Sequence, residues 1–118
     1  MKHDLQGIFD ALHEGVVILD ASGRIELLNS EAARLFGAPK ELLPGKVFAD
    51  AVGARHPAVA IVERVRLSGR ASIHDEIEFP NRHAAPIPVD VAVSRLGEDT
   101  GEATGIAIAL RDRSARAR

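Results

Sequence analysis

The sequence predicts an α+β fold in which helices cover one face of a single antiparallel sheet. The 118 residues, 46% of them hydrophobic, are enough for one core and too few for two ordinary domains. Apolar residues alternate with a period of two near both ends of the chain, and a segment with helical spacing lies between. The predicted order is therefore a helix, two strands, several short helices and three long strands.

The chain is expected to begin with an amphipathic helix within residues 1–14. Four apolar residues fall at the spacing of one helical stripe, and Gly15 ends it. We expect this stripe to form a dimer interface, with its burial against the domain's own sheet as the alternative. The residues of the stripe are Leu5, Ile8, Phe9 and Leu12.

A hairpin and a helical segment follow. Residues 16–20 and 24–28 read as two strands joined by the turn sequence Asp-Ala-Ser-Gly. Asn29 is placed to cap a helix that ends at Gly37, with direct contact to a signal as the competing role. Residues 39–43 predict one or two helical turns, and residues 56–68 predict a longer helix.

Three strands are predicted to close the chain. The period of two places Ile73 on the buried face of the first strand and His74 on its solvent face. Pro86 and Pro88 predict that the second strand begins at an edge or a bulge. The remaining residues expected on buried faces are Ile77, Phe79, Ile87, Val89, Val91, Val93, Ile106, Ile108 and Leu110.

Composition excludes several functional classes. The formal net charge is −2, and basic residues are interspersed with acidic ones until the last residues, so we expect no nucleic-acid partner and no membrane contact. The absence of cysteine excludes disulfides, thiolate metal sites and cysteine nucleophiles. No apolar run approaches the roughly 20 residues that cross a bilayer, which makes the cytoplasm the expected location.

Residues for catalysis or metal binding are not evident in the sequence. No hydroxyl residue lies in an elbow motif, and the acidic residues Asp75, Glu76 and Glu78 read as a solvated strand edge. His56 lies at the start of a predicted helix, where a capping or surface role is preferred to haem ligation. We therefore expect no catalytic residues, no metal and no cofactor in this chain, and a colourless protein.

Seven short motifs follow one another along the chain: 15–20 (GVVILD), 23–25 (GRI), 29–33 (NSEAA), 35–37 (LFG), 41–45 (ELLPG), 68–69 (SG) and 111–112 (RD). Taken in this order, they make the chain resemble a PAS domain along nearly its whole length. The resemblance implies a five-stranded antiparallel sheet with short helices on one face, and it is nearest to the sensor modules of bacterial two-component histidine kinases of the nitrogen-regulation type. The expected boundaries are residues 15–112 for the domain and 113–118 for the start of a connector.

The resemblance also implies a signal-transmission role for the closing motif. The family's Asp-Ile-Thr reads Asp112-Arg113-Ser114 here, so Asp112 and Ser114 are the expected transmission residues. An ordinary surface ion pair is the alternative for Asp112. The family's usual Asp-Gly turn between its third and fourth strands is replaced by residues 81–85, and its flavin and hydroxycinnamate photoreceptors need a cysteine that this chain lacks.

Two functions remain open on the sequence. In the first, the domain is a sensory module that passes a ligand or partner signal through its last strand to a downstream helix of an effector domain. In the second, it is a ligand-free dimerisation or docking module of a transcriptional regulator or diguanylate cyclase. A homodimer is expected in both, whereas the small molecule or regulatory protein that is sensed is not specified.

Overall fold

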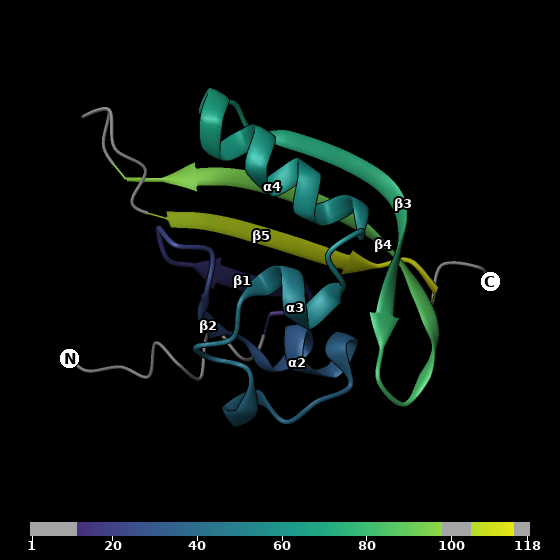
Figure 1. Cartoon of the computed structure of the whole chain (residues 1–118). Helices are drawn as coiled ribbons and strands as arrows, with labels where there is room; N and C mark the ends of the chain where they lie inside the picture. Colours follow the sequence, from purple (N-terminus) through teal and green to yellow (C-terminus); the bar gives the residue numbers. More distant parts are fainter. Residues whose placement is uncertain (1–11, 98–104, 115–118) are drawn as a thin grey trace.

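Two strands from the start of the chain and three from its end form one antiparallel sheet in the order β2-β1-β5-β4-β3 (Figure 1). The computed structural model describes residues 12–97 and 105–114, so the expected N-terminal helix lies almost wholly outside the described residues. The predicted α+β architecture is confirmed. The strands are β1 (Gly15–Leu19), β2 (Ile25–Leu28), β3 (Ser72–Asn81), β4 (Ala84–Leu96) and β5 (Gly105–Asp112).

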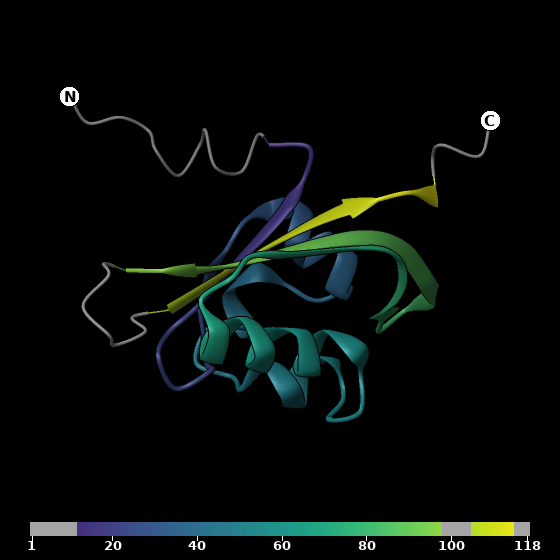
Figure 2. The same cartoon turned by 90° about the horizontal axis from the view of Figure 1, so that it is seen from above.

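The helical segment lies between β2 and β3, and Figure 2 shows α4 against one face of the sheet. The longer helix expected over residues 56–68 is confirmed, whereas residues 39–43 form only a short 3-10 turn. Helix α3 was not expected, because its five residues are too few to show a helical period. The helices are α2 (Ser30–Phe36), η1 (Lys40–Leu42), α3 (Phe48–Val52) and α4 (Pro57–Ser68).

The turn between β1 and β2 is organised by one carboxylate. Asp20 Oδ1 accepts hydrogen bonds from the backbone N–H of Ser22 at 2.9 Å and of Arg24 at 3.0 Å, and from the Ser22 hydroxyl at 2.8 Å. These bonds, led by the one from Arg24, hold the pKa of Asp20 below its ordinary value. Gly23 completes the turn with φ 89, a conformation that glycine adopts without strain.

The predicted buried face of β3 is wrong in the first half of the strand. Ile73 is 75% exposed, whereas His74 is half-buried rather than solvent-facing. The pairing register with β4 shifts between His74 and Ile77, and Glu76 within the shift has φ 55. One extra residue in a β-bulge reverses the faces of a strand, so Ile77 and Phe79 lie inward while Ile73 lies outward.

The bulge expected from the prolines of β4 is confirmed. The pairing register shifts between Phe79 and Asn81 of β3, opposite the segment that contains Pro86. Pro88 pairs with Glu78, and Pro86 lies beyond the residues that pair with β5. Within the sheet ladders, Pro88 is therefore paired with β3 alone and Pro86 with neither neighbouring strand, which suits residues that lack a backbone N–H.

The hydrophobic core lies between the sheet and the helices. The rings of Phe36 and Phe79 meet edge to face with their centroids 5.0 Å apart, joining α2 to β3. The alternation predicted for β4 and β5 is confirmed by the burial of their inward residues. Among the described residues, no helix is long and apolar enough to span a membrane. The largest fully buried side chains are Phe79, Leu19, Ile25, Leu35, Ile106, Ile108, Leu110, Val17, Val65, Val89, Val91 and Val93.

Candidate functional site

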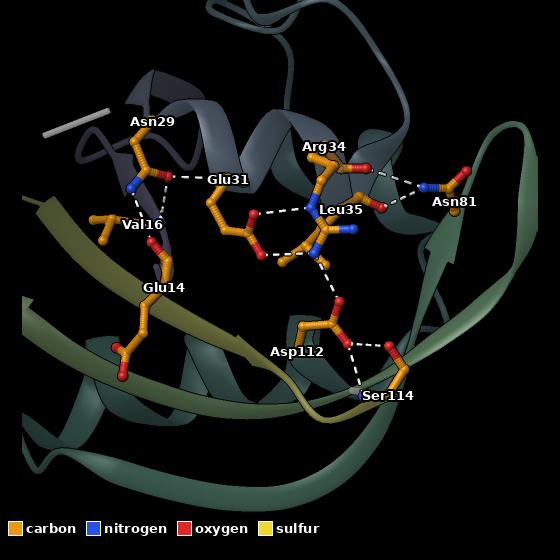
Figure 3. A network of polar contacts seen from close by, with 10 residues as sticks. Glu14, Val16, Asn29, Glu31, Arg34, Leu35, Asn81, Asp112 and Ser114 are labelled. Carbon is orange, nitrogen blue, oxygen red and sulfur yellow. Dashed lines mark hydrogen bonds and ion pairs between the residues drawn. The ribbon is translucent and has the colours of Figure 1, made fainter. Parts of the chain in front are cut away.

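The end of β5 is joined to α2 by Asp112 and its partners, as Figure 3 shows. Arg34 Nη2 donates to Asp112 Oδ2 at 2.7 Å. The backbone N–H and the hydroxyl of Ser114 donate to Asp112 Oδ1 at 2.8 and 2.6 Å. The structure thus brings together the two residues expected in signal transmission and adds Arg34, which the sequence did not single out. We call these three residues the Asp112 cluster.

Arg34 holds two carboxylates at once. Its Nε and Nη2 atoms donate to the two Glu31 oxygens at 2.8 and 2.7 Å, and Nη2 also reaches Asp112. The bonds to Glu31, followed by the bond to Asp112, raise the pKa of Arg34 above its ordinary value. Because the Arg34 side chain is 53% exposed, its pair with Asp112 contributes only about 0–1 kcal/mol. Such a contact can be broken and remade at little cost in stability.

Opposing influences set the pKa of Asp112. Burial raises it, but the hydrogen bonds from Ser114 and Arg34 outweigh burial and keep the pKa below its ordinary value. Asp112 is therefore a carboxylate at neutral pH, and its side chain is only 16% exposed. The charge at the end of β5 is thus fixed by Arg34 of α2 and by Ser114, which follows β5.

Asn81 ties the β3–β4 hairpin to the C-terminal end of α2. Its Nδ2 donates to the carbonyls of Arg34 at 3.1 Å and Leu35 at 3.0 Å, while Oδ1 accepts from the His83 backbone N–H at 2.8 Å. A Cβ on Gly37 would lie 2.6 Å from Asn81 Oδ1, so the close approach requires glycine there. Arg34 consequently contacts the hairpin through its carbonyl and β5 through its guanidinium (Figure 3).

Asn29 occupies the opposite end of α2 and is fully buried. Its Oδ1 accepts from the backbone N–H groups of Ala32 at 3.0 Å and Val16 at 2.8 Å. Its Nδ2 donates to the Glu14 carbonyl at 2.9 Å. The side chain therefore caps α2 and also fastens the start of β1 to that helix, a second role that sequence spacing does not reveal.

Arg113 replaces the apolar middle residue of the family motif and makes its own contacts. Its backbone N–H donates to the Pro88 carbonyl at 2.8 Å, and its guanidinium donates to Asp90 Oδ1 at 2.9 Å. A weaker ion pair reaches Glu76 at 3.8 Å. The bond to Asp90 raises the pKa of Arg113 above its ordinary value. The residues directly after β5 are thus held from β4 as well as from α2.

His56 is used as a helix cap. Its Nδ1 accepts from the Ala58 backbone N–H at 3.0 Å, and its Nε2 lies 2.8 Å from the Glu78 carbonyl oxygen. Because a carbonyl only accepts, Nε2 carries the proton in this geometry. Both ring nitrogens are therefore engaged, which leaves neither free for a metal. In residues 12–97 and 105–114, no three His, Asp or Glu side chains gather as metal ligands would.

Of the expected dimer residues, only Leu12 lies within the described residues, where it is 46% exposed; Leu5, Ile8 and Phe9 lie outside them. The sheet face opposite the core is apolar at its centre, and it is polar toward the ends of the central strands, where it carries Asp90, Ser94 and Arg111. It carries the residues that alternate with the buried ones, among them Val16, Ile18, Ala92, Ala107 and Ala109.

Comparisons with known proteins agree on one family. The family model described as the PAS fold matches residues 3–113. The sensory histidine kinase/phosphatase NtrB of Azospirillum brasilense is 26% identical over 91 residues, which are 77% of this chain and 23% of that protein. The chain thus spans less than a quarter of this curated relative.

Solved structures show the same fold. The PAS domain of nitrogen regulation protein NR(II) from Vibrio parahaemolyticus superposes with a TM-score of 0.75 at 16% identity, over 94% of this chain and 99% of that one. The photoactive yellow protein domain of the sensor histidine kinase Ppr from Rhodospirillum centenum gives a TM-score of 0.71 at 25% identity, over 89% of this chain and 96% of that one.

Proposed function

The chain belongs to the PAS family, and from this premise we propose that it is the sensory domain of a bacterial two-component histidine kinase. The relation to NtrB supports the kinase context. The observation that carries the proposal is the Asp112 cluster, because it joins α2, the helix that contacts the hairpin, to the residues where the chain leaves the sheet. Catalysis would belong to other parts of the natural protein, in the cytoplasm.

Signal transmission would proceed through Arg34. A ligand or partner that shifts the hairpin or the C-terminal end of α2 moves Arg34, since the Arg34 carbonyl is bonded to Asn81. Movement of the guanidinium releases Asp112, and with it the bonds from Ser114 that order the first residues of the connector. Two arrangements of residues 113 and 114 would then bias a downstream helix, as a population shift requires.

The test uses the natural protein. Its sequence after residue 118 should encode a histidine-containing dimerisation helix and an ATP-binding domain; a different effector there would contradict the kinase assignment. Asp112→Asn should change basal autophosphorylation by about fivefold or more, the lower range of allosteric coupling. Glu26→Gln, which neutralises an exposed carboxylate of β2, is the matched control. Equal activity of wild type and Asp112→Asn would refute transmission through Asp112.

We further propose that the domain is a homodimer formed through its first helix. Burying two or three of the side chains Leu5, Ile8, Phe9 and Leu12 is worth about 1.5–3 kcal/mol each, enough for weak self-association. The apolar centre of the outer sheet face offers a surface on which such a helix can lie. An isologous two-fold contact suits a kinase whose two chains act together.

Light scattering after size exclusion tests the dimer. Ile8→Asp combined with Leu12→Asp should convert a dimer into a folded monomer, with circular dichroism as the check on folding. A wild type that is monomeric at high micromolar concentration, or a double variant that unfolds, would place the helix on its own domain instead.

A ligand-free docking or dimerisation module is the second candidate function. It is favoured by the small volume, about 100 Å³, of the pocket that is lined by Leu19 of β1, Phe48 of α3 and Val62 of α4. In that case Asp112→Asn would alter self-association or partner binding without changing a response to any small molecule. The effector would then be a transcriptional regulator or a diguanylate cyclase.

A further inference from the structure

An open groove lies between the α2–α3 segment and the β3–β4 hairpin, outside the core beneath α4. It has a volume of about 730 Å³, within the range of small-molecule sites. Its apolar lining includes Leu42, which is 58% exposed, together with the buried Phe36 and Leu43 and with Ala51 of α3. No residue of α4 or β5 lines it. The groove is therefore separate from the space between the sheet and the longest described helix.

Positive charge gathers in this groove. Arg24, Lys46 and Arg82 line it and come from three separate parts of the fold, whereas Asp50 is the single carboxylate among the lining residues. The chain as a whole has a formal net charge of −2, so this local excess of cations runs against the overall charge. A cluster of one sign attracts a ligand of the opposite sign.

We propose that the groove binds a small organic anion with an apolar body. Lys46 and Arg82 would hold the anionic group, and the apolar body would lie against the exposed Leu42. Both cationic side chains are exposed, and Arg24 is already engaged by the Gly45 carbonyl at 2.9 Å. The inference rests on the proposed sensory function and names the class of ligand that the domain would sense.

The groove adjoins the network that leads to the end of β5. Asn81 lines the groove and donates to the Arg34 carbonyl, and the Arg34 guanidinium holds Asp112. A ligand that draws Arg82 toward the groove would therefore act on the residue next to Asn81. The route consists of direct contacts from the groove to the first residues of the connector.

Binding is tested on the 118-residue chain with 4-phenylbutyrate, followed by NMR chemical-shift changes. We expect saturable shifts at Phe36, Ala38 and Ala51, and none with the neutral 4-phenylbutyramide at the same concentrations. Lys46→Gln combined with Arg82→Gln should raise the dissociation constant by about three- to tenfold. The hydrogen bonds from the backbone N–H of Lys46 to the Leu43 carbonyl and from that of Arg82 to the Phe36 carbonyl do not involve the changed side chains, so the double variant should fold.

Two further variants separate charge from disruption. Asp50→Asn removes the carboxylate of the groove and should tighten binding by about two- to threefold. Arg64→Gln combined with Arg70→Gln removes two exposed cations that do not line the groove, and should leave the affinity within about a factor of 1.5. The groove double variant should weaken binding and Asp50→Asn should strengthen it. Because a general loss of structure could only weaken binding, this pair of results would exclude it as the cause of the change in affinity.

Several results would overturn the inference. The first is the absence of chemical-shift changes at groove residues with millimolar 4-phenylbutyrate. The second is equal affinity for 4-phenylbutyramide. The third is an equal rise of the dissociation constant in the groove double variant and in the control double variant. The proposed sensory function is tested separately, by Asp112→Asn in the natural protein. If the probe does not bind in the groove but Asp112→Asn still changes autophosphorylation, the ligand class is rejected and the sensory function is kept. If the probe binds in the groove but Asp112→Asn has no effect on autophosphorylation, the sensory function is rejected and the binding site is kept.

Discussion

Replacing Asn29 by alanine should destabilise the fold by about 3 kcal/mol. The buried side chain makes three hydrogen bonds, to the backbone of Ala32, Val16 and Glu14. Loss of the cap on α2 costs about 1 kcal/mol. The Val16 N–H and the Glu14 carbonyl then lose partners in a part-buried site, at about 1 kcal/mol each at the lower end of the range. The same substitution should leave the groove beside α3 intact.

Urea denaturation followed by circular dichroism measures this loss. In a thermal melt, a domain of about 100 residues loses about 4–8 °C in melting temperature per kcal/mol of destabilisation. We therefore expect the melting temperature of Asn29→Ala to fall by about 12 °C or more. Ser22→Ala, which removes an exposed hydroxyl bond to Asp20, is the control and should cost less than about 0.5 kcal/mol. A loss below about 1 kcal/mol for Asn29→Ala would refute the threefold bonding role, because the cap alone accounts for that much.

The remaining predictions concern the core, the bulge and acid stability. Val91→Ala and Ile108→Ala should each cost about 1–4 kcal/mol in thermal melts, whereas Glu78→Ala should cost little; similar shifts for all three would contradict the assigned faces. Ile73→Ser should cost under about 1 kcal/mol because its side chain is 75% exposed, and a core-sized loss would place the bulge wrongly. The pKa values of Asp112 and Asp20 lie below the ordinary 3.8, so their stabilisation is complete above about pH 4 and is lost as the pH falls through the lowered values. Asp112→Asn should therefore reduce the fall in the free energy of unfolding as the pH is lowered below about 4. An unchanged pH dependence in this variant would show that Asp112 does not contribute to acid stability.

Much of the fold could be predicted because each element has a local cause. The β1–β2 turn follows from Asp20 and Gly23, and the limits of α2 follow from Asn29 and Gly37, whose φ is 73. The face of β3 could not be predicted by alternation, since one extra residue at the bulge moves Ile73 outward without changing the composition of the strand. Helix α3 was missed because its length is below what periodicity detects.

Some contacts of the candidate site could also be predicted from local sequence, and others could not. Asp112 and Ser114 are two residues apart, so their contact follows from a local motif. Arg34 lies 78 residues before Asp112, and an exposed arginine on a short helix gives no pattern that identifies its partner. Asn81 reads in the sequence as a turn residue, yet its amide bonds to α2, 46 and 47 residues earlier.

The sequence by itself determined the order of the strands, the places of helices α2 and α4, the caps of α2 and the closing Asp-x-Ser motif, because these depend on neighbours within one or two turns of chain. Only the tertiary structure decided which residues reach Asp112, where the cations of the groove gather and which face of β3 is buried. Those features arise when β1, α2, the hairpin and β5 pack together, and packing brings into contact side chains that are dozens of residues apart. Local preferences act over a few residues, so they carry no information about such distant pairs.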